Sequence, residues 1–207
     1  MFTFAFFIIM NEVKYPMNSL QKKIISDGKV LPGNILKVDS FLNHQLDISL
    51  LRDMGKDFYT LFKDKNINKI LTIEASGIAI ACYAAEHFQV PVVFAKKGSH
   101  KNVGNDVYTA EVFSYTKGTS YEVAVSKLYL HPEDRVLIID DFLANGQAVL
   151  GLQKIIEDAG ATLCGAGIAI TKAFQQGEKL LIDAGIDVKS LAAIESMDNG
   201  TVVFRED

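Results

Sequence analysis

Residues 136–148 read Val-Leu-Ile-Ile-Asp-Asp-Phe-Leu-Ala-Asn-Gly-Gln-Ala, and this stretch decides the fold. Its four leading apolar residues, Val136 to Ile139, predict a strand that is buried on both faces, as the strands of parallel sheets are. Beyond the stretch, the apolar residues between Val149 and Ala159 recur at helical spacing. A strand that leads through a short loop into a helix is the repeating unit of α/β domains.

Two adjacent acids follow the buried strand. Asp140 and Asp141 come at its carboxyl end, which faces the ligand crevice in an open parallel sheet. Carboxylates are strong hydrogen-bond acceptors, so the pair suits the two hydroxyls of a ribose cis-diol. Because successive strand residues point to opposite sides, both acids serve one site only if the chain turns there. We therefore expect the strand to end at Ile139.

Small, flexible residues come next and open a helix: Ala144, Asn145, Gly146, Gln147 and Ala148. Unpaired N–H groups and about half a positive charge at a helix N-terminus attract phosphate, and larger side chains would keep the backbone away from it. The acids and this loop together predict a site for a ribose 5-phosphate. A plainer interpretation stays open, in which a buried strand ends in an Asp-Asp turn and Asn-Gly is an ordinary helix entry.

Two other classes of phosphate site are disfavoured. The stretch has neither the Gly-x-Gly-x-x-Gly of dinucleotide-binding folds nor the Gly-Lys-Ser/Thr of a P-loop. The formal net charge of -4 and the sequence pI of about 5.6 argue against a general nucleic-acid-binding surface. Any phosphate must therefore be bound by local geometry.

The rest of the chain alternates between helical and strand-like periods. This predicts a doubly wound α/β fold with a mostly parallel central sheet and flanking helices. Its 207 residues, 49% of them hydrophobic, suit one domain, which we place at residues 17–207. Strands are predicted at 69–73, 90–95, 108–115, 121–125, 136–139, 163–170, 190–194 and 202–204. Helices are predicted at 19–27, 47–65, 78–87, 147–159 and 175–184.

Residues 1–16 stand apart from this pattern. Met1 to Met10 read MFTFAFFIIM, a run far shorter than the about 20 residues that span a bilayer. The run also lacks the basic leader and the cleavage site of a secretory signal. We favour translation from Met17, and expect residues 1–16 to be an extension that is disordered or not native. Export is the alternative.

The two cysteines bear on the compartment. Cys82 and Cys164 lie far apart in apolar segments, and two cysteines supply neither a disulfide framework nor a zinc-ligand set. They predict buried free thiols in a reducing cytoplasm. We expect no membrane and no nucleic acid among the partners.

The 136–148 stretch resembles the signature of the type I phosphoribosyltransferases, which bind 5-phospho-α-D-ribose 1-diphosphate (PRPP). Four further segments are similar to bacterial xanthine phosphoribosyltransferases, namely 38–45, 72–79, 92–97 and 170–175. The Phe-Leu-Asn-His-Gln run from Phe41 to Gln45 is the part that points to xanthine. The resemblance covers residues 17 to about 205.

This resemblance implies a reaction and its site. Xanthine and PRPP would give xanthosine 5′-monophosphate and diphosphate in purine salvage. Asp140 and Asp141 would hold the ribose hydroxyls, and residues 144–148 would bind the 5-phosphate. Ser76 and Gly77, at a strand-to-helix turn, would receive the leaving diphosphate, and Lys97 would add a positive charge to it. Mg²⁺ would be carried by the diphosphate, so no dedicated metal residue is named.

The resemblance also implies a base site. Leu36 and Asn43 lie in the N-terminal region that resembles the small hood of the family, and Lys172 ends a predicted strand. Lys172 would face the 6-oxo group of the base and Asn43 its polar edge. Leu36 and Phe41 would supply apolar contact, and Phe174 would stack on the base. The family further implies a homodimer.

Two alternatives and one loop complete the expectations. A PRPP-sensing transcriptional regulator of the same fold would need an attached DNA-binding domain, for which residues 17–69 leave no room. A transferase that prefers guanine or hypoxanthine stays open. The basic loop from Lys96 to Asp106 is interpreted either as a lid over an anionic substrate or as a mobile hairpin.

Overall fold

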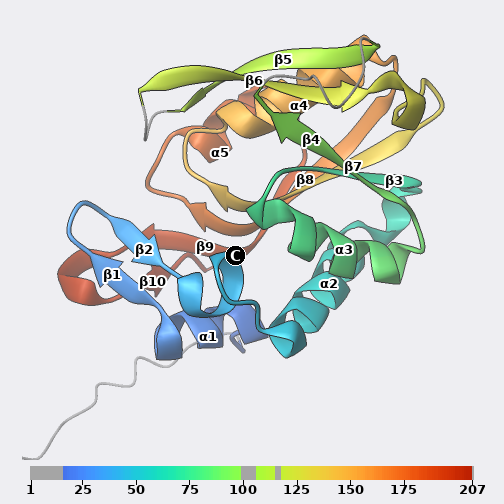
Figure 1. The fold of residues 1–207 in the computed structure, drawn as a ribbon. Coiled ribbons are helices and arrows are strands. Elements are labelled where there is room, and N and C mark those ends of the chain that lie inside the picture. The colour runs from blue at the N-terminus through green and yellow to red at the C-terminus, as the bar shows by residue number, and fades with distance from the viewer. Residues whose placement is uncertain (1–15, 99–105, 115–117, 207) are drawn as a thin grey trace, which may run out of the picture.

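One eight-stranded sheet, with helices on both faces, forms the body of the computed structural model, which describes residues 16–98, 106–114 and 118–206 (Figure 1). The strands are β3 Lys69–Ile73, β4 Val92–Lys97, β5 Val107–Ser114, β6 Thr119–Ser126, β7 Arg135–Leu143, β8 Thr162–Lys172, β9 Val188–Ser196 and β10 Val203–Phe204. The helices are α1 Ser19–Asp27, α2 Ile48–Phe62, α3 Ser76–Phe88, α4 Gln147–Asp158 and α5 Gly177–Asp183. Shorter turns are η1 Asp39–Asn43, η2 Lys63–Lys65, η3 Lys127–Tyr129 and η4 Asp198–Gly200.

The order of strands in the sheet is β10-β9-β8-β7-β3-β4-β6-β5. The five central strands from β9 to β4 are parallel, whereas β10 at one edge and β6 and β5 at the other pair antiparallel. This confirms the predicted doubly wound, mostly parallel sheet. A separate two-stranded hairpin, β1 Lys29–Leu31 and β2 Ile35–Lys37, projects beside β9 and β10 and was not predicted (Figure 1).

The central strands separate two hydrophobic cores. Along β7, Leu137 and Ile139 pack into the core under α1, α2 and α3, while Val136 and Ile138 pack into the core under α4 and α5. All four side chains are fully buried, as the apolar run predicts. The prediction of buried cysteines is wrong for Cys82, which is exposed on α3, whereas Cys164 is buried. Helix α3 packs through its alanines, which leaves Cys82 on its outer face.

The strand prediction at residues 136–139 is too short. β7 continues to Leu143, and Asp140, Phe142 and Leu143 all pair with β8. The predicted turn at the two acids is therefore wrong, because the ladder to β8 extends past them. The chain leaves the sheet at Ala144, four residues after Asp140.

A buried ion pair ties the start of β3 to the loop before β7. The Lys69 ammonium donates to Asp134 at 2.6 Å and to the Tyr129 carbonyl at 2.7 Å. Asp134 also accepts from the His131 N–H at 2.7 Å. The residues Lys69 and Asp134 are only 8% and 6% exposed, so neither charge can be solvated if the other is removed.

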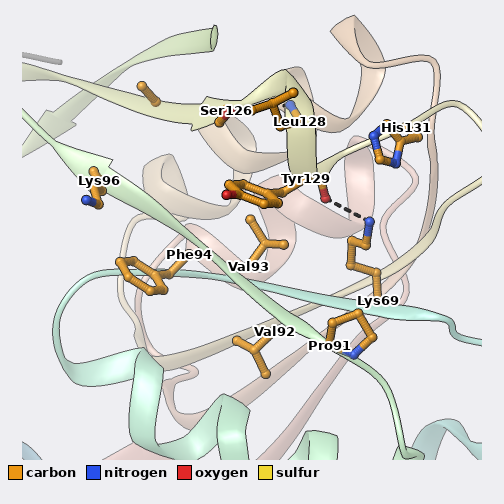
Figure 2. A pocket seen from close by; sticks show the side chains of 11 residues that line it. Lys69, Pro91, Val92, Val93, Phe94, Lys96, Ser126, Leu128, Tyr129 and His131 are labelled. Atoms are coloured by element: carbon orange, nitrogen blue, oxygen red, sulfur yellow. Dashed lines mark hydrogen bonds between the residues drawn. The ribbon is translucent and has the colours of Figure 1, made fainter. Parts of the chain in front are cut away.

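Lys69 borders a cavity of about 600 Å³ that lies between β4 and the segment from Ser126 to His131 (Figure 2). Apolar side chains such as Val92 and Val93 form much of its wall. Lys69 and Val92 are the first residues of β3 and β4, so much of this cavity lies toward the amino ends of those strands. Ligands of open α/β sheets bind at the opposite, carboxyl ends. We therefore look for the functional site elsewhere.

The ion pair predicts a strong contrast between two Lys→Met substitutions. Lys69→Met leaves the buried Asp134 carboxylate without its ion-pair partner. It should therefore lower the free energy of unfolding by about 3 kcal/mol. Lys154→Met is the control, because Lys154 pairs with Asp158 at an exposed helical position and should cost about 0.5 kcal/mol or less. Urea unfolding measures both, and equal losses would contradict the assigned role of burial.

Candidate functional site

Asp140 and the loop that follows β7 share one small cavity. It measures about 150 Å³ and is lined by Asp140, by all five residues from Ala144 to Ala148, and by side chains of β5 and β6. The cavity lies at the carboxyl end of β7, where the ribose 5-phosphate site is predicted. The structure thus brings together one acid and the whole predicted phosphate loop.

The loop has the shape of an anion cradle. Gly146 precedes α4 with a φ of 77°, a left-handed conformation that glycine adopts without strain. The Gly177 N–H donates to the Ala144 carbonyl at 3.0 Å, which holds the loop against the start of α5. No side chain of the described residues caps the N-terminus of α4. Its first N–H groups are therefore available to an anion.

The two acids do not share one environment. Asp140 is 4% exposed and lines the cavity, whereas Asp141 is half-buried and does not. They are successive residues of a continuous strand, yet their carboxyls interact: the Asp141 charge and a side-chain hydrogen bond with Asp141 both raise the pKa of Asp140. The Asp141 N–H donates to Asp140 Oδ1 at 3.0 Å and orients that carboxylate.

The environment of Asp140 disfavours the charged form of its carboxyl. Burial raises the pKa of its carboxyl well above the usual range, the neighbouring Asp141 charge raises it further, and the Lys97 charge lowers it. A ligand that donates hydrogen bonds would offset the desolvation of this carboxylate. The cavity therefore suits hydroxyl groups beside Asp140.

The Ser76–Gly77 turn lies next to the same acid. Ser76 is the first residue of α3, and the Glu74–Ala75 peptide bond before it is cis. A Cβ at Gly77 would lie 3.3 Å from Asp140 Oδ1 and 2.1 Å from Thr72 Oγ1, so only glycine fits here. Thr72 Oγ1 is buried and has no partner among the described residues. The structure thus joins the predicted diphosphate turn to Asp140.

Lys97 ends β4 and reaches the site from a third strand. Its N–H donates to the Glu74 carboxylate at 2.7 Å, and its ammonium lies 5.5 Å from the centroid of the Tyr121 ring. Tyr121 lines the small cavity, and burial together with the Asp140 charge raises the pKa of its phenol. Sequence analysis missed both Tyr121 and Thr72. Neither carries a signal, because each belongs to an ordinary β-rich run and is placed only by the sheet.

The predicted base residues lie in and beside the hood, the part of the chain between α1 and α2. Lys172, at the end of β8, donates to the Asn34 carbonyl at 2.8 Å, two residues before Leu36. Leu36 is 7% exposed and belongs largely to the core, while Asn43 is exposed at the end of η1. Burial lowers the pKa of the Lys172 ammonium.

Two aromatic residues expected at the base differ in exposure. Phe41 is fully buried in the core under α1 and α2, so the expectation that it contacts the base is wrong. Its place in the turn η1 directs the ring inward rather than into the crevice. Phe174, after β8, is 40% exposed and free to meet a ligand. Of the predicted lid, Lys96 and Lys97 belong to β4, and residues 99–105 lie outside the described residues.

A magnesium ion would find few protein ligands here. Within residues 16–98, 106–114 and 118–206, no three or more His, Cys, Asp or Glu side chains are grouped to hold a metal. Of the two acids, Asp140 lines the small cavity. This donor set fits a hard cation that brings most of its own oxygen ligands, such as Mg²⁺ on a diphosphate.

Comparison with known proteins decides the family. The phosphoribosyl transferase domain matches residues 37–205. The chain belongs to the phosphoribosyltransferase family. It is 59% identical over 190 residues to a xanthine phosphoribosyltransferase from Ruminiclostridium cellulolyticum, covering 92% of this chain and 100% of that one. It is 55% identical over 189 residues to one from Clostridium novyi, covering 91% and 100%. The predicted kinship with xanthine phosphoribosyltransferases is confirmed.

Solved phosphoribosyltransferases share the fold. An adenine phosphoribosyltransferase from Trypanosoma brucei superposes with a TM-score of 0.69 at 19% identity, covering 82% of this chain and 77% of that one. One from Giardia lamblia gives a TM-score of 0.65 at 22% identity, covering 76% and 84%. No helix among the described residues is long and apolar enough to cross a membrane.

The environment of Asp140 predicts a stability that depends on pH. Because its folded-state pKa is raised, the folded protein binds that proton more tightly than the unfolded chain does. Stability therefore falls as the pH rises from the ordinary carboxyl range through the raised pKa. Asp140→Asn removes this loss, so its Tm should exceed that of the native chain at pH 8 by about 2 to 6 °C, and the gap should shrink toward pH 4.

Thermal unfolding without ligand, across this pH range, measures the effect. Asp64→Asn is the control, since Asp64 lies exposed on η2 and should leave the Tm unchanged at each pH. If the difference in Tm between Asp140→Asn and the native chain is the same at every pH, the pKa of the Asp140 carboxyl is not raised by burial, and the prediction is wrong.

Proposed function

We propose that this protein transfers the 5-phosphoribosyl group of PRPP to xanthine, forming xanthosine 5′-monophosphate and diphosphate in purine salvage. The observation that carries the proposal is the shared cavity of Asp140 and residues 144–148 at the N-terminus of α4. Membership of the phosphoribosyltransferase family fixes the reaction type, and the two relatives described above are both xanthine phosphoribosyltransferases.

The sugar phosphate is bound by backbone and carboxylate groups. The uncapped N–H groups at the start of α4 receive the 5-phosphate, and the small residues Ala144 and Gly146 let the phosphate approach them. Asp140 accepts hydrogen bonds from the ribose hydroxyls, which compensate for the desolvation of its charge by burial. Asp141 donates its N–H to Asp140 Oδ1 and so orients that carboxylate.

The transfer exchanges one bond at the anomeric carbon for another. A purine nitrogen forms the new C–N bond while the C–O bond to diphosphate breaks, through a transition state with oxocarbenium character. The negative charge of the leaving diphosphate is stabilised by Ser76, Gly77 and Lys97. Mg²⁺ carried by the diphosphate, when bound, neutralises part of that charge.

The base is recognised by donors that match an oxopurine. The Lys172 ammonium donates to the 6-oxo group, and an amino group at that position, as in adenine, would face a cation. Asn43 contacts the polar edge of the base, with Leu36 against its ring. Both residues lie between α1 and α2 in the chain, in the hood.

A product assay across four purines tests the function. With PRPP and Mg²⁺, xanthine should give the highest kcat/KM, guanine and hypoxanthine lower values, and adenine no product. The matched negative control is the double variant Asp140→Asn with Asp141→Asn, whose turnover should fall by orders of magnitude while the chain stays folded.

The alternatives are outcomes of the same assay. Tight PRPP binding without nucleotide product would favour a sensor, and a higher kcat/KM for guanine or hypoxanthine would change the substrate. Near-normal turnover in the double variant would contradict the role given to the two acids.

The proposal includes a cytoplasmic homodimer whose native chain starts at Met17. In support, α1 begins with its own capping box: the Asn18 side chain accepts from the Gln21 N–H at 2.9 Å, and the Gln21 side chain accepts from the Asn18 N–H at 3.0 Å. The Asn18 amide also donates to the Leu191 carbonyl of β9 at 2.6 Å. These hydrogen bonds fix the start of α1 within two residues of Met17.

Mass measurements test both points. Protein from the native gene should have the intact mass of a chain that starts at Met17, and light scattering should give twice the mass of one chain. A mature chain that starts beyond Met17, at one of residues 18–30, after an export-type cleavage would overturn the cytoplasmic assignment.

A further inference from the structure

The hydrogen bond from Lys172 to the Asn34 carbonyl joins the sheet to the hood. Its donor is the last residue of β8, and its acceptor lies 138 residues earlier in the chain, in the turn between β1 and β2. The Nζ–O distance is 2.8 Å. This is a direct contact between a predicted base-binding side chain and a main-chain group to which no role has been given.

The direction of that carbonyl depends on an uncommon backbone conformation. The turn consists of Pro32, Gly33 and Asn34, between the paired residues Leu31 and Ile35. Gly33 has a φ of 83° and Asn34 a φ of 58°. Asparagine tolerates the left-handed region, whereas a β-branched residue is a true outlier there. The residue type at position 34 therefore controls where the carbonyl points.

The hairpin holds this carbonyl in a fixed place. Its strands pair in register from Lys29 with Lys37 to Leu31 with Ile35, Leu36 is buried in the core, and Val30 packs against the same core. Leu36, the predicted apolar contact of the base, lies two residues from Asn34. One rigid element thus carries both an apolar contact and an acceptor for the ammonium.

The ammonium needs such an acceptor. Lys172 is half-buried, and desolvation disfavours its charged form. A lysine ammonium has three N–H donors on a flexible stem. A bond to Asn34 occupies one donor and restrains the stem, and it leaves two donors for a base in the crevice.

We propose that Asn34 is a positioning residue for base recognition, whose left-handed main chain aims the Lys172 ammonium at the oxopurine through the Asn34 carbonyl. The proposal rests on the function given above, since it assumes that Lys172 meets the base. The opposite effect is physically distinct: a carbonyl that competes with the base for the ammonium would weaken xanthine binding, and its removal would strengthen it.

The test compares substitutions that differ in their access to the left-handed region. Asn34→Val should raise the KM for xanthine about tenfold, the order expected for losing one hydrogen bond to a charged group. The kcat and the KM for PRPP should stay within about twofold of the native values, because the sugar site lies on other elements. Asn34→Gly is the matched control, since it removes the side chain, keeps the conformation and should leave all constants unchanged.

A double-mutant cycle separates positioning from a general disturbance of the hood. Lys172→Met alone should also raise the KM for xanthine. If Asn34 acts through Lys172, Asn34→Val should have no further effect in the Lys172→Met chain. Asn34→Ala, a milder change, serves the same cycle if Asn34→Val fails to fold.

Each outcome decides the matter. Independent, multiplying effects of the two substitutions, or an equal loss in Asn34→Gly, would overturn the inference. A lower KM for xanthine in Asn34→Val would show that the carbonyl competes with the base. If the native chain forms nucleotide from xanthine but the effects of the two substitutions on the KM multiply, only this inference fails. If the native chain forms no nucleotide from xanthine, the proposed function itself fails.

Discussion

The site depends on the Asp140 carboxylate, which the fold buries beside a second acid. Asp140 lies inside β7, between two hydrophobic cores, and is 4% exposed. The fold holds it with one N–H donor from Asp141 and the more distant charge of Lys97. Carboxyls whose pKa is raised by burial and by a neighbouring like charge concentrate at functional sites. A diol that donates hydrogen bonds to Asp140 would offset the free-energy cost of desolvating its carboxylate.

The parallel sheet explains why the other groups converge on this acid. β3, β4 and β7 are neighbours in the same sheet, and each ends at the same edge. The turn after β3 supplies Gly77, the end of β4 supplies Lys97, and the loop after β7 supplies the start of α4. Groups that lie far apart in sequence thus surround one position because parallel strands share a carboxyl edge. The antiparallel strand β6 adds Tyr121 from the side.

How much the sequence could predict follows from the range of the interactions involved. The Asp-Asp pair and the small loop are contiguous, so a local pattern of burial and helix entry located both, and the resemblance gave them roles. The predicted end of β7 was wrong, because two acids interrupt its apolar run, and Phe142 and Leu143 beyond them still pair with β8 through backbone groups that no side-chain pattern reports. The β1–β2 hairpin was missed, since its three-residue strands are too short to show alternation. Thr72 and Tyr121 gain meaning only from neighbours in the sheet.

The two halves of the site are therefore built by different means. The sugar-phosphate half uses backbone N–H groups and one strand-borne acid, all within nine residues from Asp140 to Ala148. The base half joins β8 to a hairpin more than a hundred residues away, through Lys172 and a carbonyl whose direction is a property of the backbone at Asn34. Among the described residues, the hood and the α4 loop share no hydrogen bond, so separate contacts hold the two halves.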